Sequence, residues 1–468
     1  MKALTDKPPQ ELSRSLESRH ITMISIGGVI GAGLFVSSSA AIAATGPAIV
    51  ISYLITGLLV LLVMRMLGEM ALTLPKVRSF TEFARAGLGP WGGFVAGWLY
   101  GYFWMIVVPV EAIAGANILH GWLAPHEVSP LLLGIVLMAV MTLVNLMSAR
   151  SYGEFEFWFA SIKVAAIIVF IGLAAAFALG LSPHAGGGFA NLTANGGFVP
   201  RGWTAVLSGA VTVYFALTGP EITTIAAAES REPARAVARM SSTVVLRILA
   251  FYAGSILLIV TVVPWVQVKS GESPFTLALT AMQYRWASLA MSAIILTAVL
   301  SCLNSAFYVC SRVLFVLAEH GDAPQWLVQL NGRRVPTRSV WMGSLAGVLG
   351  VLAATAHSQA VFAFLVNASG ALMVFVYTMI VVAHLRVRRA REASGAPAPA
   401  LTMWLFPWLD YLALAGMAAV LIAMACTPQM QADLRASLLT LLVAIGAFLV
   451  VGARRRAQAL RSPQPVRP

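Results

Sequence analysis

The chain has 468 residues, of which 59% are hydrophobic and only 10% are charged, and its mean hydropathy is +0.84. A water-soluble protein of this length would need far more polar surface, so this composition excludes a soluble globular protein. The formal net charge of +13 does not indicate nucleic-acid binding, because the basic residues are spread over several loops instead of one solvated face. The chain is therefore predicted to lie in a lipid bilayer and to bind no nucleic acid.

Twelve apolar segments of the sequence have the length of about 20 residues that a helix needs to cross a hydrocarbon core. They are expected, in chain order, at residues 22–44, 47–70, 92–119, 130–148, 154–180, 203–229, 244–266, 287–317, 338–356, 360–384, 405–426 and 433–452. The fold class predicted from this pattern is an all-α membrane protein with twelve transmembrane helices.

The polar connections between these segments are short, and they leave no room for a separate soluble domain. We expect a tail at 1–20, a single transmembrane domain at 21–456 and a second tail at 457–468. Most of the 31 Lys and Arg residues lie in the tails or in the connections after even-numbered segments. By the positive-inside rule, this asymmetry predicts that both termini are cytoplasmic.

The first segment contains a run of glycines, GGVIGAGLF, at residues 27–35. Glycine costs a helix about 1 kcal/mol per position relative to alanine, so this run favours an interruption of the helix. Interrupted backbone is tolerated in a membrane only where it faces a cavity or other protein. A second interpretation stays open, because Gly27 and Gly31 also have the small-residue spacing of a helix-packing face.

A matching interruption is expected five segments later, at Thr218-Gly219-Pro220-Glu221. Thr as an N-cap, Pro in the first turn and Glu three residues after the Thr are the signature of a helix start. Paired interruptions in two halves of a chain are typical of transporters built from inverted repeats. We therefore predict a 5+5 inverted repeat, with repeats at about 21–180 and 203–386, helices at about 405–452 appended, and a carboxylate site at the half-helix ends.

Ionisable side chains inside a membrane are costly, so each is a candidate functional residue. Lys163 lies deep in its segment, where desolvation disfavours the charged form and permits proton exchange; a permanently charged lysine bonded to carbonyls is the alternative. Glu221 is either the cap of the second half-helix or a proton-sensing carboxyl beside the substrate. Glu111 is expected to pair with a substrate amine or to bond a neighbouring helix.

Five further polar residues are expected at the ends or contacts of helices. Glu69, near the end of the second segment, is expected within reach of water as a helix-end or gate contact. Glu154 and Glu156 suit the positive end of the dipole of their helix, as structural residues or as part of a gate. Asn304 and Ser305 are expected to bond the buried lysine or the first interruption, or else to join helices by hydrogen bonds.

The sequence indicates neither a metal site nor a cofactor. The seven histidines are scattered without metal-ligand spacing, and no P-loop, nucleophile elbow or dinucleotide fingerprint occurs. No nucleophiles and bases converge, which argues against an enzyme. A single asymmetric chain also lacks the filter or charged ring of an ion channel.

Seven blocks between Arg19 and about Arg456 are familiar: RHITMISIGGVIGAGLFV (19–36), MRMLGEMA (64–71), SYGEFEFW (151–158), PEITTIAAAES (220–230), SCLNSAFY (301–308), HGDAP (320–324) and MWLFPWL (403–409). Through these blocks the chain resembles the bacterial amino acid permeases of the amino acid/polyamine/organocation (APC) superfamily. Among them it looks most like the 4-aminobutyrate (GABA) permeases.

The resemblance implies import of a small amino acid by proton symport with alternating access across the bacterial inner membrane, without a cofactor. The binding residues that it implies are Ile30, Gly31, Ala32 and Gly33 for the substrate's carboxylate and Phe215, Ala216 and Thr218 for its amino group, with Phe215 as an aromatic gate. In similar transporters a lysine in the position of Lys163 replaces a sodium ion between helices 1 and 8, which implies a role in proton coupling. A permease for another neutral amino acid, such as proline or an aromatic one, and a sensor that binds without transporting are the alternatives.

Overall fold

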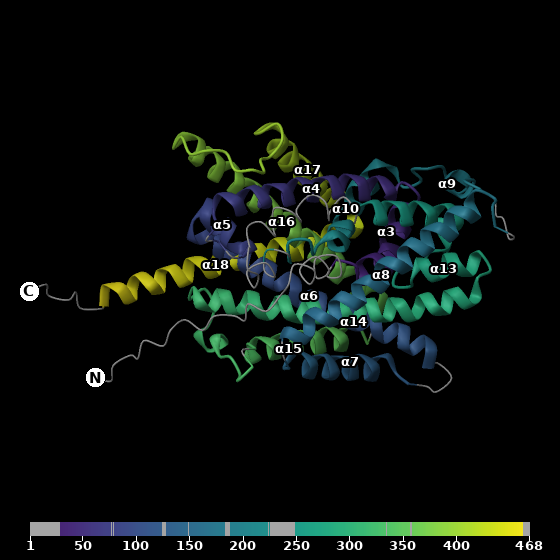
Figure 1. Ribbon diagram of the computed structural model, residues 1–468, viewed down its shortest axis with the longest axis horizontal. Coiled ribbons are helices and arrows are strands. Elements are labelled where there is room, and N and C mark those ends of the chain that lie inside the picture. Colours follow the sequence, from purple (N-terminus) through teal and green to yellow (C-terminus); the bar gives the residue numbers. More distant parts are fainter. Residues whose placement is uncertain are drawn as a thin grey trace, which may run out of the picture.

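The computed structural model describes residues 29–75, 77, 79–123, 128–147, 149–182, 188–222, 224, 249–333, 335–355 and 358–461, with the backbone alone for 149–155, 358 and 454–461. Every regular element in these residues is a helix (Figure 1). The α-helices are α2 (Ala32–Phe35), α3 (Ser38–Thr45), α4 (Ile49–Thr73), α5 (Phe80–Leu88), α6 (Pro90–Leu123), α7 (Pro130–Asn145), α8 (Ala149–Ala178), α9 (Asn191–Ala194), α10 (Gly202–Leu217), α13 (Pro274–Ala281), α14 (Arg285–Glu319), α15 (Thr337–Ala353), α16 (Ser358–Ala393), α17 (Trp408–Cys426) and α18 (Gln431–Arg461), with a further helix described over Leu249–Val262. Three short 3-10 helices accompany them: η2 (Trp265–Gln267), η3 (Gln325–Val328) and η4 (Pro428–Met430).

Seven helices in the described part of the chain are long and apolar enough to cross a membrane, namely α4, α6, α8, α14, α16, α17 and α18. Shorter apolar helices occupy the positions of other predicted segments: Ala32–Thr45, Pro130–Asn145, Gly202–Leu217, Leu249–Val262 and Thr337–Ala353. The prediction of an all-helical membrane protein is confirmed, and the count of twelve crossings stays a prediction.

Apolar side chains cover the outward faces of the peripheral helices. On α18, Leu439, Leu442 and Leu449 are 62%, 64% and 63% exposed. Leu143 on α7 and Ile422 on α17 are exposed to a similar degree, at 65% and 62%. Such a surface is expected where helices contact lipid instead of water.

Helix α6 lies at the centre of the bundle, where it runs beside α14 (Figure 1). It also packs against α5, α7, α15, α16 and α18, and most of its side chains are buried. Its sequence is apolar around the whole circumference, as expected for a helix enclosed by others. Because α6 carries Tyr100, Trp104 and Glu111 into the interior, it positions much of the candidate site.

One short helix, α5, lies between the predicted membrane segments and was not predicted. The Ser79 side chain accepts a hydrogen bond from the backbone N–H of Glu82 at 3.3 Å, and Gly89, with φ of +82°, ends the helix. Ser followed three residues later by Glu is a helix-start signal, and Gly is a stop signal. The local sequence therefore specifies α5, but the segment is too short and too polar to be counted as a membrane crossing.

Candidate functional site

The first predicted interruption lies immediately before Ala32. Residues 29–31 are not helical, Gly31 has φ of −140° and ψ of −147°, outside the helical region, and α2 begins at Ala32. A short turn then separates α2 from α3. The interruption is thus present, although Ala32 and Gly33 already belong to the first turn of α2. The first two glycines of the run lie outside the described residues.

The second predicted interruption lies at the end of α10. This helix ends at Leu217, Thr218 has an extended backbone, and Gly219 has φ of +135°, a region that favours glycine. The Oγ1 of Thr218 donates to the carbonyl of Tyr214, one turn back, at 2.7 Å, and its role as the cap of a following helix stays a prediction. Glu221 does act as a cap, since its carboxylate accepts the N–H of Gly219 at 3.0 Å.

The Glu221 carboxylate also joins this interruption to two other helices. Tyr100 of α6 and Tyr377 of α16 donate their hydroxyls to it at 3.2 and 3.0 Å, and Glu221 is fully buried. Three donors on one buried carboxylate offset much of the cost of removing it from water. The capping role expected for Glu221 is therefore observed, and the proton-sensing role stays a prediction.

The two interrupted helices touch where their side chains are smallest. A Cβ added to Gly33 would lie 2.8 Å from the Cα of Ala216 on α10, which is too close for any real contact. A Cβ added to Gly31 would lie 2.5 Å from the Cβ of Cys302 and 2.8 Å from Oε1 of Glu111. Gly33 therefore permits close packing of the two helices, although the packing interpretation had named Gly27 and Gly31; Gly31 lies in the interruption itself, and Gly27 lies outside the described residues.

A carboxylate from within the chain occupies the N-terminal end of α2. The backbone N–H of Ala32 donates to both carboxylate oxygens of Glu111, each at 3.1 Å, and Glu111 is 1% exposed. The sequence predicted that a carboxylate would bind this amide, but it assigned that carboxylate to a substrate. The hydroxyl of Tyr252 donates to the carbonyl of Val29 at 3.0 Å, which satisfies a backbone acceptor on the other side of the interruption.

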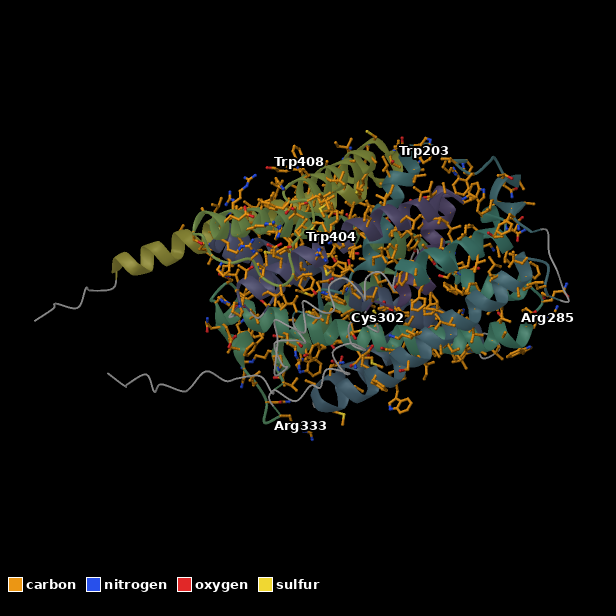
Figure 2. All side chains as sticks on the ribbon, turned by 45° about the horizontal axis from the view of Figure 1, so that its top comes forward. Trp203, Arg285, Cys302, Arg333, Trp404 and Trp408 are labelled. Carbon is orange, nitrogen blue, oxygen red and sulfur yellow. The ribbon has the colours of Figure 1, made fainter. Side chains whose placement is uncertain are left out.

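A small cavity lies between the two interruptions. Its lining consists of Val29, Gly33, Phe103, Trp104, Val107, Glu111, Phe215, Thr218 and Cys302. Cys302 is midway along α14, and Figure 2 places it well inside the bundle, far from Arg285 at the start of the same helix. The water-accessible volume is about 10 Å³, close to the minimum for one water molecule.

The cavity brings together several of the predicted binding residues. Gly33, Glu111, Phe215 and Thr218 line it. Ile30, Gly31, Ala32 and Ala216 are buried in the two backbone segments that border it. Nothing in the sequence singled out Phe103, whose ring centroid lies 6.2 Å from that of Phe215, because it is one of several aromatic residues in the first half of α6.

Lys163 of α8 is fully buried and belongs to a polar cluster with Glu156 and Ser301. Its Nζ donates to Oγ of Ser301 at 2.8 Å and lies 3.6 Å from Oε1 of Glu156. The Ser301 hydroxyl lies 2.7 and 2.6 Å from the two carboxylate oxygens of Glu156. Residues seven apart share a helix face, so the sequence contained the signal for the Glu156–Lys163 pair. Ser301 adjoins Cys302, which places the cluster next to the cavity.

The remaining predicted residues have other surroundings. Oδ1 of Asn304 accepts a hydrogen bond from Nδ2 of Asn145 on α7 at 2.7 Å, which is the helix-joining contact of the alternative interpretation. Ser305 is buried in α14. The side chain of Glu154 lies outside the described residues. Within the described part of the chain, no group of three or more His, Cys, Asp and Glu side chains is arranged to hold a metal ion.

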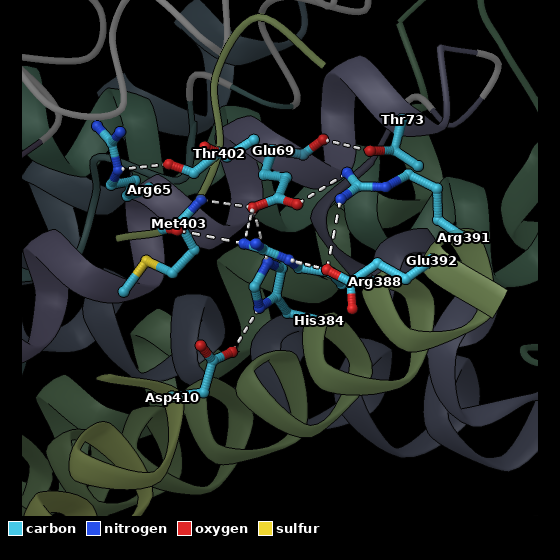
Figure 3. A network of polar contacts seen from close by, with 10 residues as sticks. All are labelled: Arg65, Glu69, Thr73, His384, Arg388, Arg391, Glu392, Thr402, Met403 and Asp410. Atoms are coloured by element: carbon cyan, nitrogen blue, oxygen red, sulfur yellow. Dashed lines mark hydrogen bonds and ion pairs between the residues drawn. The ribbon is translucent and has the colours of Figure 1, made fainter. Parts of the chain in front are cut away.

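Glu69 was expected within reach of water, but it is only 1% exposed, so that expectation is wrong. Its carboxylate accepts hydrogen bonds from the backbone N–H of Met403, from Arg391 and from Arg388 (Figure 3). The expectation failed because the segment before α17 folds over the end of α4, a contact between residues 334 positions apart in the chain.

Comparisons with known proteins agree with this architecture. The amino acid permease family model matches residues 20–461. The chain is 44% identical over 424 residues to the gamma-aminobutyric acid permease of Bacillus subtilis, with 90% of each chain covered. It is 41% identical over 454 residues to the gamma-aminobutyric acid permease of Escherichia coli, with 97% of this chain and 96% of the relative covered.

The fold is also similar to a solved structure of a manganese transporter mutant from Eremococcus coleocola. The TM-score is 0.59 at 15% sequence identity, with 97% of this chain and 98% of that chain covered. At this identity the likeness concerns the fold alone. Because the family match spans almost the whole sequence, this multi-pass membrane protein is not an enzyme but a member of the amino acid permease family.

Proposed function

We propose that the chain imports 4-aminobutyrate by proton symport with alternating access across a bacterial inner membrane, with both termini in the cytoplasm. The observation that carries the proposal is the identity of 44% and 41% to two gamma-aminobutyric acid permeases over nearly full length. The small cavity between two interrupted helices supports it, since transporters of this construction bind their substrates there.

The substrate's carboxylate would accept the N–H of Ala32, in place of Glu111. Two carboxylates cannot share one buried N–H without strong repulsion, so substrate binding requires Glu111 to withdraw. Its withdrawal also enlarges a cavity that is too small for seven non-hydrogen atoms. Glu111 would then be free to approach the substrate's ammonium group, which the carbonyl end of α10 near Phe215, Ala216 and Thr218 attracts through the helix dipole.

Proton coupling is assigned to the two buried clusters that flank the cavity. Lys163 lies within 3.6 Å of Glu156 and shares Ser301 with it, so a proton that moves within this cluster changes how α8 holds α14. Glu221 binds the second interruption to α6 and α16, so its protonation would loosen three contacts together. Both clusters join helices that must separate if the site is to open to alternate sides.

The aromatic lining favours GABA over an aromatic amino acid, because Phe103, Trp104 and Phe215 would still border the cavity after Glu111 withdraws and would leave less room for a ring than for a slender chain. The decisive experiment is uptake of labelled GABA into proteoliposomes, with and without an imposed proton gradient. Proline and phenylalanine serve as competitors. Accumulation that depends on the gradient and resists both competitors is expected. Flux without gradient dependence would remove proton coupling, and binding without flux would indicate a sensor.

A further inference from the structure

A second buried polar network lies outside the substrate site, where α4, α16 and α17 meet the segment that precedes α17. Glu69, His384 and Asp410 contribute from these three helices, and each is at most 1% exposed. Figure 3 shows the His384 ring between the other two carboxylates. None of the three residues lines the cavity between the interruptions.

On one side of the His384 ring, the Glu69 carboxylate accepts hydrogen bonds from several donors. Its oxygens accept the N–H of Met403 at 2.6 Å, Nη1 of Arg391 at 2.9 Å and Nη1 of Arg388 at 3.2 Å. Nε2 of His384 lies 3.2 Å from the same carboxylate. Two guanidinium groups keep Glu69 ionised, and an ionised carboxylate only accepts hydrogen bonds. Nε2 of His384 must therefore carry a hydrogen.

On the other side, Asp410 depends on the histidine. Its Oδ1 lies 2.5 Å from Nδ1 of His384, and its buried Oδ2 has no partner among the described residues. A nitrogen lone pair and a carboxylate oxygen repel each other at this distance unless a proton lies between them. Because Nε2 already holds one hydrogen, this contact needs a second, exchangeable proton, carried by either Nδ1 or Asp410.

The surrounding charges balance without that proton. The carboxylates of the network are Glu69, Glu392 and Asp410, and the guanidinium groups that face it are those of Arg65, Arg388 and Arg391. Arg65 and Arg388 are held by the rings of Trp404 and Phe406, at 3.8 and 4.1 Å from the ring centroids. The proton between His384 and Asp410 adds one positive charge to a network whose described carboxylates and guanidinium groups balance without it, so it can leave while the Arg–Glu ion pairs stay in place.

We propose that His384 and Asp410 form a proton-binding site, separate from the substrate site, that fastens α17 and the segment before it to α4 and α16. When the proton is bound, the contact closes this end of the bundle. When the proton leaves, the two electron-rich atoms repel each other and α17 is released from α16. The site deepens the proposed proton symport, but its existence can be tested without any substrate.

The test is the thermal unfolding midpoint (Tm) of the purified full-length protein between about pH 6 and pH 9, the range that spans histidine titration, with no amino acid added. The folded contact binds a proton that the unfolded chain has lost at neutral pH, so stability must fall as the pH rises. The expected decrease in Tm is on the order of 2 °C per pH unit while the proton is retained only by the folded state.

Asp410→Asn is the informative variant, because an amide can donate to the neutral histidine and so keeps the contact without a proton. We expect a folded protein whose Tm no longer shows this decrease. His320→Gln is the matched control, since His320 lies on the surface 3.4 Å from Glu82, and it should keep the wild-type slope. Equal slopes for wild type and Asp410→Asn would overturn the proposal.

His384→Gln is the second variant in case Asp410→Asn does not fold, because a glutamine amide can also contact both carboxylates. It should flatten the same part of the Tm profile, and a wild-type slope would reject the site. In proteoliposomes, either variant should also shift the pH dependence of GABA exchange on one side of the membrane. If Tm responds as expected but no GABA is transported, the proton site stands and the proposed substrate fails.

Discussion

Replacing Glu111 with glutamine tests whether an internal carboxylate competes with the substrate for the Ala32 amide. Glutamine keeps the length and shape of the side chain and one acceptor oxygen, so the substitution removes the charge and little else. In the wild type, both oxygens of Glu111 lie 3.1 Å from the nitrogen of Ala32 in a fully buried site. The variant should therefore leave this amide more readily available to another carboxylate.

The size of the effect follows from the change in hydrogen-bond type. A hydrogen bond to a charged group stabilises by about 1.5–3 kcal/mol, and a neutral one by about 0.5–1.5 kcal/mol. The variant thus weakens the internal contact by about 1–1.5 kcal/mol. Since every 1.4 kcal/mol corresponds to a factor of ten, a competing carboxylate should bind about five- to tenfold more tightly.

Butyrate and n-butylamine separate the two ends of GABA, because each keeps only one charged group. Displacement of labelled GABA should show tighter binding of butyrate to Glu111→Gln than to the wild type, measured at one fixed pH. Butylamine should not bind more tightly, since it has no carboxylate to compete. Asp433→Asn is the matched control, because Asp433 is a buried acid on α18 that bonds Asn367 and does not line the cavity.

Two results of the butyrate experiment would refute competition between Glu111 and the substrate's carboxylate. If butyrate binds Glu111→Gln no better than the wild type, then Glu111 does not hold the Ala32 amide against the substrate. A loss of butyrate binding would mean instead that Glu111 helps to form the carboxylate site. Either result would refute the competition, whereas weaker binding of GABA alone would not, because the proposed function also brings Glu111 to the substrate's ammonium group.

Two further substitutions test the packing and the coupling. Gly33→Ala should lower both Tm and GABA binding, because its Cβ would meet the backbone of Ala216 at 2.8 Å, whereas Gly446→Ala on α18 has open space and should change neither in the same thermal and binding assays. Lys163→Met should abolish accumulation of GABA against a gradient in proteoliposomes while counterflow survives. Adding Glu156→Gln should recover part of the stability that the single variant loses, about 3–5 kcal/mol for an uncompensated buried charge. Full accumulation by Lys163→Met would exclude the coupling role.

The interruptions were predictable because their causes are local. Glycine in a membrane helix and a Gly-Pro step each change the backbone where they occur, so Gly31 and Gly219 marked the ends of helical structure from the sequence alone. The capping function of Glu221 was predictable for the same reason, since it lies two residues from the N–H that it accepts. The backward hydrogen bond of Thr218 was not predicted, because a threonine hydroxyl can donate to a carbonyl of its own helix as well as cap the next one.

The contacts that complete the sites are long-range and leave no local signal. Glu111 and Ala32 are 79 residues apart, and Glu69 and His384 are 315 apart. Helix α16 also runs to Ala393, whereas the prediction ended at 384. The prediction stopped early because the last turns of the helix carry arginines, which lower the hydropathy. Two of them, Arg388 and Arg391, pair with Glu69, and Arg388 also lies over the Phe406 ring, contacts that a hydropathy pattern cannot anticipate.

The pairing of Glu111 with Ala32 follows from the cost of an interrupted helix in a low-dielectric interior. A buried N–H without an acceptor costs about 1–3 kcal/mol, and a membrane offers no water to replace one. A transporter must nevertheless expose such an N–H to a substrate and then lose that substrate in every cycle. In the proposed cycle, Glu111 would provide an acceptor at the steps when the substrate provides none, so the amide would be satisfied throughout. The proposed exchange would also limit affinity, because each substrate carboxylate would have to displace a carboxylate that the chain itself supplies.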